Sequence, residues 1–255
     1  MDERQPTIFG EVADLYDRVR PGYPDHLFKD LTELCDLAPA SHVVEVGAGT
    51  GKATAGLAAL GLRVTAIEPS KPMADVLQAR ALPGVQVQVV RFEDAEVDPG
   101  QASLVLCAQA WHWVQRPLAY TRTHVMLEPG GHLALVANRR HEFPDDLLRR
   151  IRSHYARFAP GLEESVPGSD ANRQAEWVEE IEASGLFGTT VSRDYLHGST
   201  VSPSDFVDLL ATQSDHRLLP REQLDALLDA IRSEVEPLGH IDLTYDCHLL
   251  LARRT

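Results

Sequence analysis

A glycine-rich turn between a short apolar strand and a helix is the feature that most constrains this chain. Residues 43–54 read VVEVGAGTGKAT, and the apolar run before Gly47 favours a buried strand. Glycine lets a backbone turn tightly and approach a ligand, and the following helix offers free N–H groups. The next expected strand, 63–68, ends on Glu68, 19 residues after Gly49, where a carboxylate can accept both hydroxyls of a ribose. We therefore expect a ligand that carries a ribose.

Several ligands compete for this turn. A nucleoside triphosphate loop needs a glycine where Val46 stands and a serine or threonine where Ala53 stands. A dinucleotide loop has the spacing G-x-G-x-x-G, whereas Thr50 alone separates Gly49 from Gly51. The Tyr-x-x-x-Lys pair of many dehydrogenases is missing as well. A structural turn without a ligand remains an alternative to a ligand site.

Strands and helices alternate along the first half of the chain, which predicts a parallel sheet with right-handed crossovers. The expected strands are 43–46, 63–68, 85–92, 103–107 and 132–137. The expected helices are 25–37, 52–60, 71–81 and 118–127, and residues 128–131 are expected to form a turn. In the second half we expect helices at 147–158, 177–186, 204–211 and 221–235, and strands at 189–200 and 243–252.

The order of expected strands and helices shows no linker and no internal repeat that would separate two domains. We expect a single domain over residues 1–255, since this length can bury one large core. The helical pieces 139–170 and 203–237 are expected to form a cap on the α/β domain.

These motifs, in this order, resemble the class I S-adenosylmethionine-dependent methyltransferases across residues 9–138, and more loosely to the end. The resemblance implies an α/β, doubly wound, Rossmann-like fold with a seven-stranded sheet. The strand order would be 3-2-1-4-5-7-6, with strand 7 antiparallel. The cofactor would be S-adenosyl-L-methionine. Residues 126–131, MLEPGG, match the family's structural turn before the fifth strand.

The resemblance also implies the residues that hold the cofactor. The glycine loop would lie under the methionine part, Glu68 would bind the ribose, and residues 69–73 would flank the adenine. Asp94 would accept a bond from the adenine amino group, and the Ala95 N–H would meet the ring. The full expected set is Glu45, Gly47, Ala48, Gly49, Thr50, Gly51, Glu68, Pro69, Met73, Asp94, Ala95 and Gln109.

A narrower resemblance concerns Phe9, residues 16–24 (YDRVRPGYP) and residues 111–113 (WHW). These segments are similar to a small-molecule branch of the family that includes the trans-aconitate methyltransferases. The similarity implies that residues 1–24 cover the cofactor, with Tyr16 and Arg20 near its carboxylate. A packing tyrosine and a surface arginine are the alternatives. We expect residues 1–24 and 139–170 to be more mobile without ligand than the central strands.

The acceptor should approach from the end of the fourth strand, where residues 107–113 read CAQAWHW. Methyltransferases of DNA amino groups or protein amides carry Asn/Asp-Pro-Pro-Tyr/Phe/Trp there, and this chain does not. His112 is the candidate general base by position and residue type, unless it contacts the cofactor or holds the loop. Tyr23, Trp111 and Trp113 are the candidate substrate-binding residues, with core packing expected for at least one tryptophan.

Charge and composition restrict the partners. With 24 basic and 38 acidic residues the net charge is −14, which argues against nucleic acid as a partner. The arginines of 139–158 could attract an anionic substrate, but helical spacing places most of them toward solvent. The sequence has no HExxH pattern, so we expect no metal site. Its three cysteines are far apart, its N-terminus is polar and it has no long apolar run, so we expect a cytoplasmic protein that does not bind membranes. The alternative function is cofactor binding without transfer.

Overall fold

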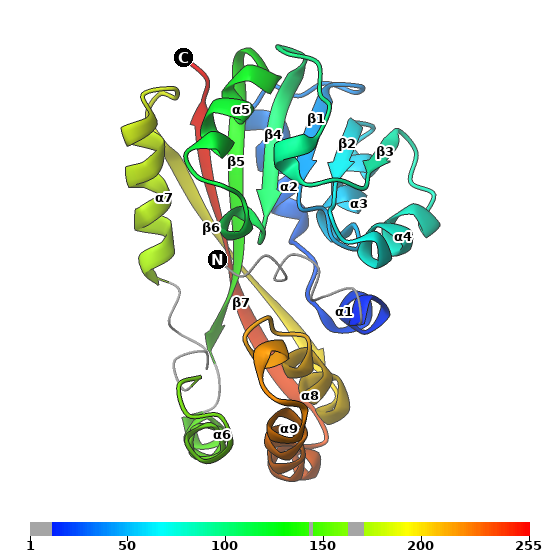
Figure 1. The fold of residues 1–255 in the computed structure, drawn as a ribbon, viewed down its shortest axis with the longest axis vertical. Helices are drawn as coiled ribbons and strands as arrows, with labels where there is room; N and C mark the ends of the chain where they lie inside the picture. The colour runs from blue at the N-terminus through cyan, green and yellow to red at the C-terminus, as the bar shows by residue number, and fades with distance from the viewer. Residues whose placement is uncertain (1–11, 143–144, 163–170) are drawn as a thin grey trace.

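A computed structural model of the chain describes residues 12–142, 145–162 and 171–255. Its seven strands form one sheet in the order β3-β2-β1-β4-β5-β7-β6, and β7 runs antiparallel to both of its neighbours (Figure 1). This confirms the expected fold class. The strands are β1 (His42–Val46), β2 (Arg63–Ile67), β3 (Val85–Gln88), β4 (Ala102–Ala108), β5 (Leu127–Glu142), β6 (Val191–Val201) and β7 (Ile241–Arg253).

Helices cover both faces of this sheet. One core cluster joins the sheet to α2 and α3 through Leu27, Leu31 and Leu57, and the other joins it to α5 and α7 through Tyr120 and Ile181. The central strands β1 and β4 are buried on both faces, because a parallel strand in the middle of such a layered fold has no solvent side. The helices are α1 (Ala13–Val19), α2 (Asp25–Leu34), α3 (Lys52–Ala59), α4 (Lys71–Ala79), α5 (Leu118–Met126), α6 (Asp145–Phe158), α7 (Ala171–Ser184), α8 (Pro203–Ala211) and α9 (Arg221–Val235).

A second group of helices, α6, α8 and α9, lies beyond the carboxyl ends of the parallel strands (Figure 1). We call it the lower helical cluster. Its apolar interior includes Ile151, Phe206 and Ile231, all nearly inaccessible to solvent, and the start of β7 enters it through Leu243. Arg149 on α6 has a side chain that is 74% exposed, as the helical spacing predicts for the arginines of this segment.

Some boundaries differ from those expected. Strand β3 ends at Gln88, before residue 92, because residues 92–94 close a 3₁₀ turn, η3 (Phe92–Asp94). Residues 128–131, expected to form a turn before the strand, instead belong to β5 and form a bulge, because the pairing with β4 shifts register there. Gly130 has a φ of +82° in this bulge. The short helix α1 was not expected at all. In the described part of the chain, no helix is long and apolar enough to cross a membrane.

Candidate active site

The glycine loop leaves the carboxyl end of β1 with a backbone that needs glycine. Gly47, Gly49 and Gly51 have φ values of +69°, +57° and +88°. A Cβ on Gly47 would lie 2.3 Å from the Cβ of Ala110, so the loops after β1 and β4 touch at this point. The N–H groups of Gly47 and Ala48 both donate to the Ile67 carbonyl, at 2.8 and 3.0 Å, which fixes the loop to the end of β2.

Glu68, directly after β2, holds the same loop with its side chain. Its Oε2 accepts from the Gly49 N–H at 2.9 Å, and its Oε1 accepts from the Ser70 N–H at 2.8 Å. Burial raises the pKa of Glu68 to about 7, although these N–H bonds oppose the shift. Each carboxylate oxygen accepts two bonds, so both keep one free position for a ribose hydroxyl.

Glu45, near the end of β1, brings a second carboxyl group into this region. Its side chain is 2% exposed, and burial, helped by the nearby Glu68 carboxylate, raises its pKa to about 8. Within the described residues, the Oε2 of Glu45 is buried without a hydrogen-bond partner. A buried polar atom without a partner costs free energy, and a ligand with a positive charge, such as the amino group of a methionine moiety, would favour the ionised form of Glu45 and lower its raised pKa.

The expected adenine side of the site is formed by Met73, Pro69 and the turn η3. The Met73 methyl lies 3.6 Å from a Cβ placed on Gly49, so the side chain borders the loop. Asp94 is exposed at the end of η3, whereas Ala95 is buried and its N–H donates a long bond, 3.3 Å, to the Phe92 carbonyl. A ring nitrogen at Ala95 would have to share that N–H or replace its bond.

Arg122 supports this turn and was not expected from the sequence. Its guanidinium donates to the Ala95 carbonyl at 2.7 Å and lies 5.7 Å from the centre of the Phe92 ring. These contacts come from α5, which is distant in sequence, so no local pattern around Arg122 points to them. These contacts fix the turn η3, which carries Asp94 and Ala95 of the expected adenine site.

The segment after β4 contains the candidate acceptor residues. Trp111 is 1% exposed and its indole N–H donates to the Tyr120 hydroxyl at 3.0 Å, so it fills the core-packing role expected for one tryptophan. His112 and Trp113 are only partly buried, with ring centres 4.4 Å apart. Gln109, with a φ of +64°, donates its side-chain N–H to the Asn138 carbonyl at 2.7 Å.

The segment that follows α1 lies against the same edge of the sheet. Burial raises the pKa of Tyr23 well above its usual value, with Tyr16, Cys247 and Glu45 close enough to add to the shift. The Asn138 side chain donates to the Gly22 carbonyl at 2.8 Å and faces the His197 ring at 3.0 Å. Asn138 therefore joins the N-terminal segment to β5 and β6, a role that its place at the end of an apolar strand could have suggested.

Arg20, expected near the carboxylate of the cofactor, binds Thr212 in this structure. Its guanidinium stacks over Tyr16, 5.0 Å from the ring centre, and donates to the Thr212 hydroxyl and carbonyl at 2.9 and 2.7 Å. Thr212 follows α8, so Arg20 connects the N-terminal segment to the lower helical cluster. Phe9 and the rest of residues 1–11 lie outside the described residues.

Comparisons with known proteins agree with this architecture. The family described as "Methyltransferase domain" matches residues 44–135. An uncharacterized methyltransferase of Mycobacterium tuberculosis is 35% identical over 192 residues, which cover 73% of this chain and 76% of that protein. A protein from Anaeromyxobacter dehalogenans described as a type II methyltransferase has a similar fold, with a TM-score of 0.65, 21% identity, and coverage of 92% of this chain and 97% of that one.

Phosphoethanolamine N-methyltransferase 2 of Haemonchus contortus, solved with S-adenosyl-L-methionine, has a TM-score of 0.53 at 14% identity, covering 99% of this chain and 58% of that one. The fold and the glycine loop thus define a class I S-adenosylmethionine-dependent methyltransferase. The chain belongs to the methyltransferase family, as its mycobacterial relative shows, and S-adenosylmethionine is its cofactor. Among the described residues no group of His, Cys, Asp and Glu side chains could hold a metal ion.

Proposed function

We propose that this enzyme transfers the methyl group to a small-molecule acceptor by in-line displacement, in the branch that resembles the trans-aconitate methyltransferases. The observation that carries the proposal is the position of Tyr23. This tyrosine follows α1, yet its side chain packs against the core cluster that contains Ala48 of the glycine loop and Leu106 of β4. The N-terminal segment therefore reaches across the edge where cofactor and acceptor must meet, which leaves room for a small acceptor.

The cofactor residues are assigned by the contacts they are free to make. Glu68 would hold the ribose, Glu45 the positively charged methionine end, and Asp94 with the Ala95 N–H the adenine. Glycines 47, 49 and 51, with Ala48 and Thr50 between them, would form the floor. Tyr16 and Gln109 border the methionine end, and Arg20 would have to release or share its bonds to Thr212 to reach a carboxylate there.

The cofactor, when bound, supplies a methyl group already activated for displacement by its positively charged sulfur. The chain therefore has to align the acceptor and keep water away. Tyr23 and Trp113 are the side chains that would border the acceptor, and Trp111 would support them from the core. His112 would take a proton at an imidazole nitrogen from a phenol, amide or carbon acid, whereas a carboxylate acceptor would need no base.

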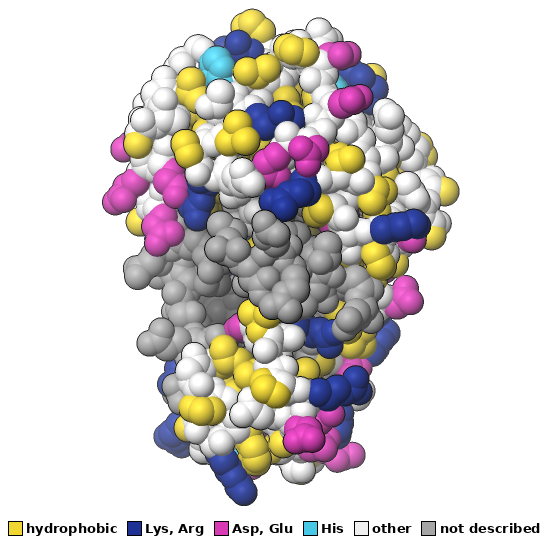
Figure 2. Space-filling model, in the orientation of Figure 1, with side chains coloured by type: hydrophobic (Ala, Val, Ile, Leu, Met, Phe, Trp, Pro, Cys, Tyr) yellow, Lys and Arg dark blue, Asp and Glu magenta, His cyan; other side chains and the backbone are white. Residues whose placement is uncertain are grey.

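The surface supports a small acceptor over a nucleic acid. On the face drawn in Figure 2, Lys and Arg side chains are interspersed with Asp and Glu. Together with the net charge of −14, this gives a phosphate backbone little to bind. We further propose that residues 1–24 cover the cofactor and that 139–170 and 203–237 cap the acceptor side of a single domain, since α6, α8 and α9 lie beyond the carboxyl edge of the sheet (Figure 1).

The experiment is transfer of an isotope-labelled methyl group from S-adenosylmethionine to a panel of carboxylates, phenols, amines and thiols, with transfer RNA and duplex DNA included. We expect label in a small molecule, and at least about tenfold less of it with the Glu68→Ala protein at limiting cofactor. Label found only in nucleic acid or protein would overturn the proposal. With the acceptor known, His112→Ala should lower kcat by at least about 100-fold if His112 is the base. It should change kcat little if the histidine only holds the loop.

A further inference from the structure

Helix α1 contacts the cofactor loop on one side. The Asp17 carboxylate binds the Arg80 guanidinium at 2.6 Å, and the same guanidinium donates through Nε to the Thr50 carbonyl at 2.8 Å. Lys52, the first residue of α3, donates its ammonium to the Asp17 carbonyl at 2.7 Å. Thr50 lies between two glycines of the loop, so one chain of hydrogen bonds connects α1 to the main chain on which the cofactor would rest.

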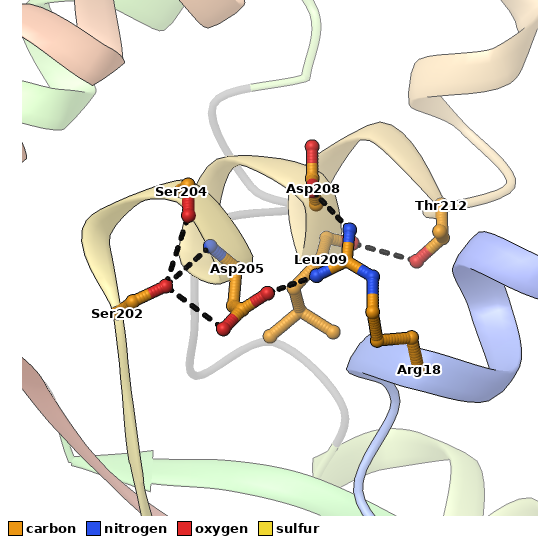
Figure 3. Close-up of polar contacts among 7 residues, drawn as sticks. All are labelled: Arg18, Ser202, Ser204, Asp205, Asp208, Leu209 and Thr212. Carbon is orange, nitrogen blue, oxygen red and sulfur yellow. Dashed lines mark hydrogen bonds and ion pairs between the residues drawn. The ribbon is translucent and has the colours of Figure 1, made fainter.

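The next residue, Arg18, points to the lower helical cluster. Its guanidinium binds the Asp205 carboxylate and, at 2.5 Å, the Asp208 carboxylate, both on α8 (Figure 3). Asp205 is held in place by Ser202, whose hydroxyl accepts from the Asp205 N–H at 3.0 Å and donates to its carboxylate at 2.8 Å. Arg18 therefore meets a carboxylate pair whose geometry is set by the N-terminal cap of α8.

These contacts have little value as simple stabilisers. The Arg18 side chain is 52% exposed, and those of Asp205 and Asp208 are 38% and 31% exposed. Ion pairs at this level of exposure contribute little to folding, because water screens them. Asp205 and Asp208 stand three residues apart on one face of α8, where their like charges repel each other. The positive charge of Arg18 relieves this repulsion, so the position of α8 depends on where Arg18 lies.

We propose that α1 couples the two halves of the molecule: occupancy of the glycine loop is transmitted through Asp17 and Arg18 to α8, with Arg18 as a positioning residue. The inference rests on the proposed placement of the cofactor on that loop. A bound cofactor fixes Thr50, Thr50 fixes Arg80 and Asp17, and the helix then presents Arg18 to Asp205 and Asp208. Cofactor binding would thus order the acceptor side before the acceptor arrives, and the coupling is reciprocal.

The test uses S-adenosylhomocysteine, the cofactor without its methyl group, as the probe, and needs no acceptor. Hydrogen exchange of residues 203–211 is measured with and without the probe, beside the probe's Kd from calorimetry. In the wild type we expect the probe to slow exchange in α8 at least fivefold. In Arg18→Ala the effect should fall to half or less, the remainder passing through the bonds from Arg20 to Thr212, and Arg18→Lys should restore part of it. The matched control is Arg149→Ala, which removes an exposed arginine that pairs with Asp146 on α6.

The double variant Asp205→Asn/Asp208→Asn removes the same contact from the α8 side and should match Arg18→Ala. Equal protection of α8 in wild type and Arg18→Ala would overturn the inference, as would a wild type that binds the probe without any change in α8. These outcomes leave the proposed function untouched. Failure of the wild type to bind the probe would remove the proposed cofactor placement and the inference with it, and calorimetry separates the two cases.

Discussion

The carboxylate of Glu68 accepts a hydrogen bond from the main-chain N–H of Gly49 at 2.9 Å. The side chain expected to bind the ribose therefore also sets the conformation of the loop expected to carry the methionine part. Gly49 has a positive φ, +57°, and the Gly49 N–H bond to Glu68 helps to hold the backbone there. The site is preorganised to this extent, which lowers the ordering cost of binding.

Removing this carboxylate should weaken cofactor binding. Charge-assisted bonds contribute on the order of 1.5–3 kcal/mol each when buried, so Glu68→Ala should raise the Kd for S-adenosylhomocysteine at least about tenfold, or ~1.4 kcal/mol. Glu68→Gln should do less harm because its amide oxygen still accepts. Calorimetry measures both, with Glu33→Ala as the control, since Glu33 is an exposed glutamate on α2. If both variants bind like the wild type, the ribose lies elsewhere.

Gly49→Val should abolish binding in a protein that still folds. The cost to folding is strain, about 1–2 kcal/mol or somewhat more for a β-branched residue at a left-handed φ. A Cβ at Gly49 has only the Met73 methyl near it, at 3.6 Å, so the valine would project into the space proposed for the cofactor. Gly100→Val is the matched control, because Gly100 has a φ of +68° and no atom within 4 Å of its added Cβ. Similar melting temperatures with binding lost only in Gly49→Val would support the site; wild-type affinity in that variant would reject it.

Glu45 makes stability depend on pH in an identifiable direction. Its pKa is near 4.5 in an unfolded chain and about 8 in the folded protein, so the folded state keeps a proton that the unfolded state releases. The free energy of unfolding therefore falls as pH rises from about 4.5 to about 8, by at most ~1.4 kcal/mol per pH unit from this group. Glu45→Gln should gain stability relative to wild type as pH rises from 5 to 8.

Urea unfolding at pH 5, 6, 7 and 8 checks this. Buried His42 and partly buried His132 and His197 have pKa values lowered by desolvation and give the opposite slope, but they are present in both proteins and cancel in the difference. A difference between Glu45→Gln and wild type that stays constant with pH would show that Glu45 is ionised in the folded protein at pH 5.

Asn138→Leu should loosen the N-terminal segment while keeping the branched shape of the side chain. The change removes the donor to the Gly22 carbonyl and the acceptor that faces His197, so Tyr23 loses its support over Glu45. We expect the Kd for S-adenosylhomocysteine to rise three- to tenfold, and amide exchange of residues 20–24 to quicken. Thr200→Val is the control, since it removes an exposed bond from Thr200 to Asp242 between β6 and β7. Unchanged affinity with unchanged exchange would show that Asn138 does not hold the segment.

The elements that the sequence predicts well are those whose apolar residue pattern follows directly from how they are buried. Val43 to Val46 and Ser103 to Cys107 are apolar because the central strands have no exposed face, and Glu68 stands out because it ends such a strand. The strand order came from the resemblance to a family, not from periodicity. Boundaries fail where a local pattern competes with tertiary structure: residues 89–92 alternate like a strand, but the chain leaves the sheet to form η3.

Helix α1 could not have been predicted in this way. It is seven residues long, and its partners Arg80, Asp208 and Thr212 come from parts of the chain far away in sequence. Which of Trp111 and Trp113 packs in the core could not be predicted either, because both stand in one short motif. The structure decides it, since the indole N–H of Trp111 donates to the hydroxyl of Tyr120, which lies nine residues later. Arg20 shows the limit of a motif, because its neighbours in sequence do not reveal that Thr212 binds it.

Strand β7 runs from the sheet between the helical layers into the lower helical cluster and pairs with β5 and β6 along its length. Leu135 and Leu250 pair in the first region, whereas Leu243 and Ile231 pack in the second. One hydrogen-bonded ladder thus supports both the sheet core and the lower helical cluster, and we expect the two to unfold in a single cooperative transition. If the lower cluster binds the acceptor, as proposed, sequence changes there that alter acceptor choice will also change the stability of the cofactor loop. Divergence toward new substrates is limited in this architecture by the stability margin of the whole chain.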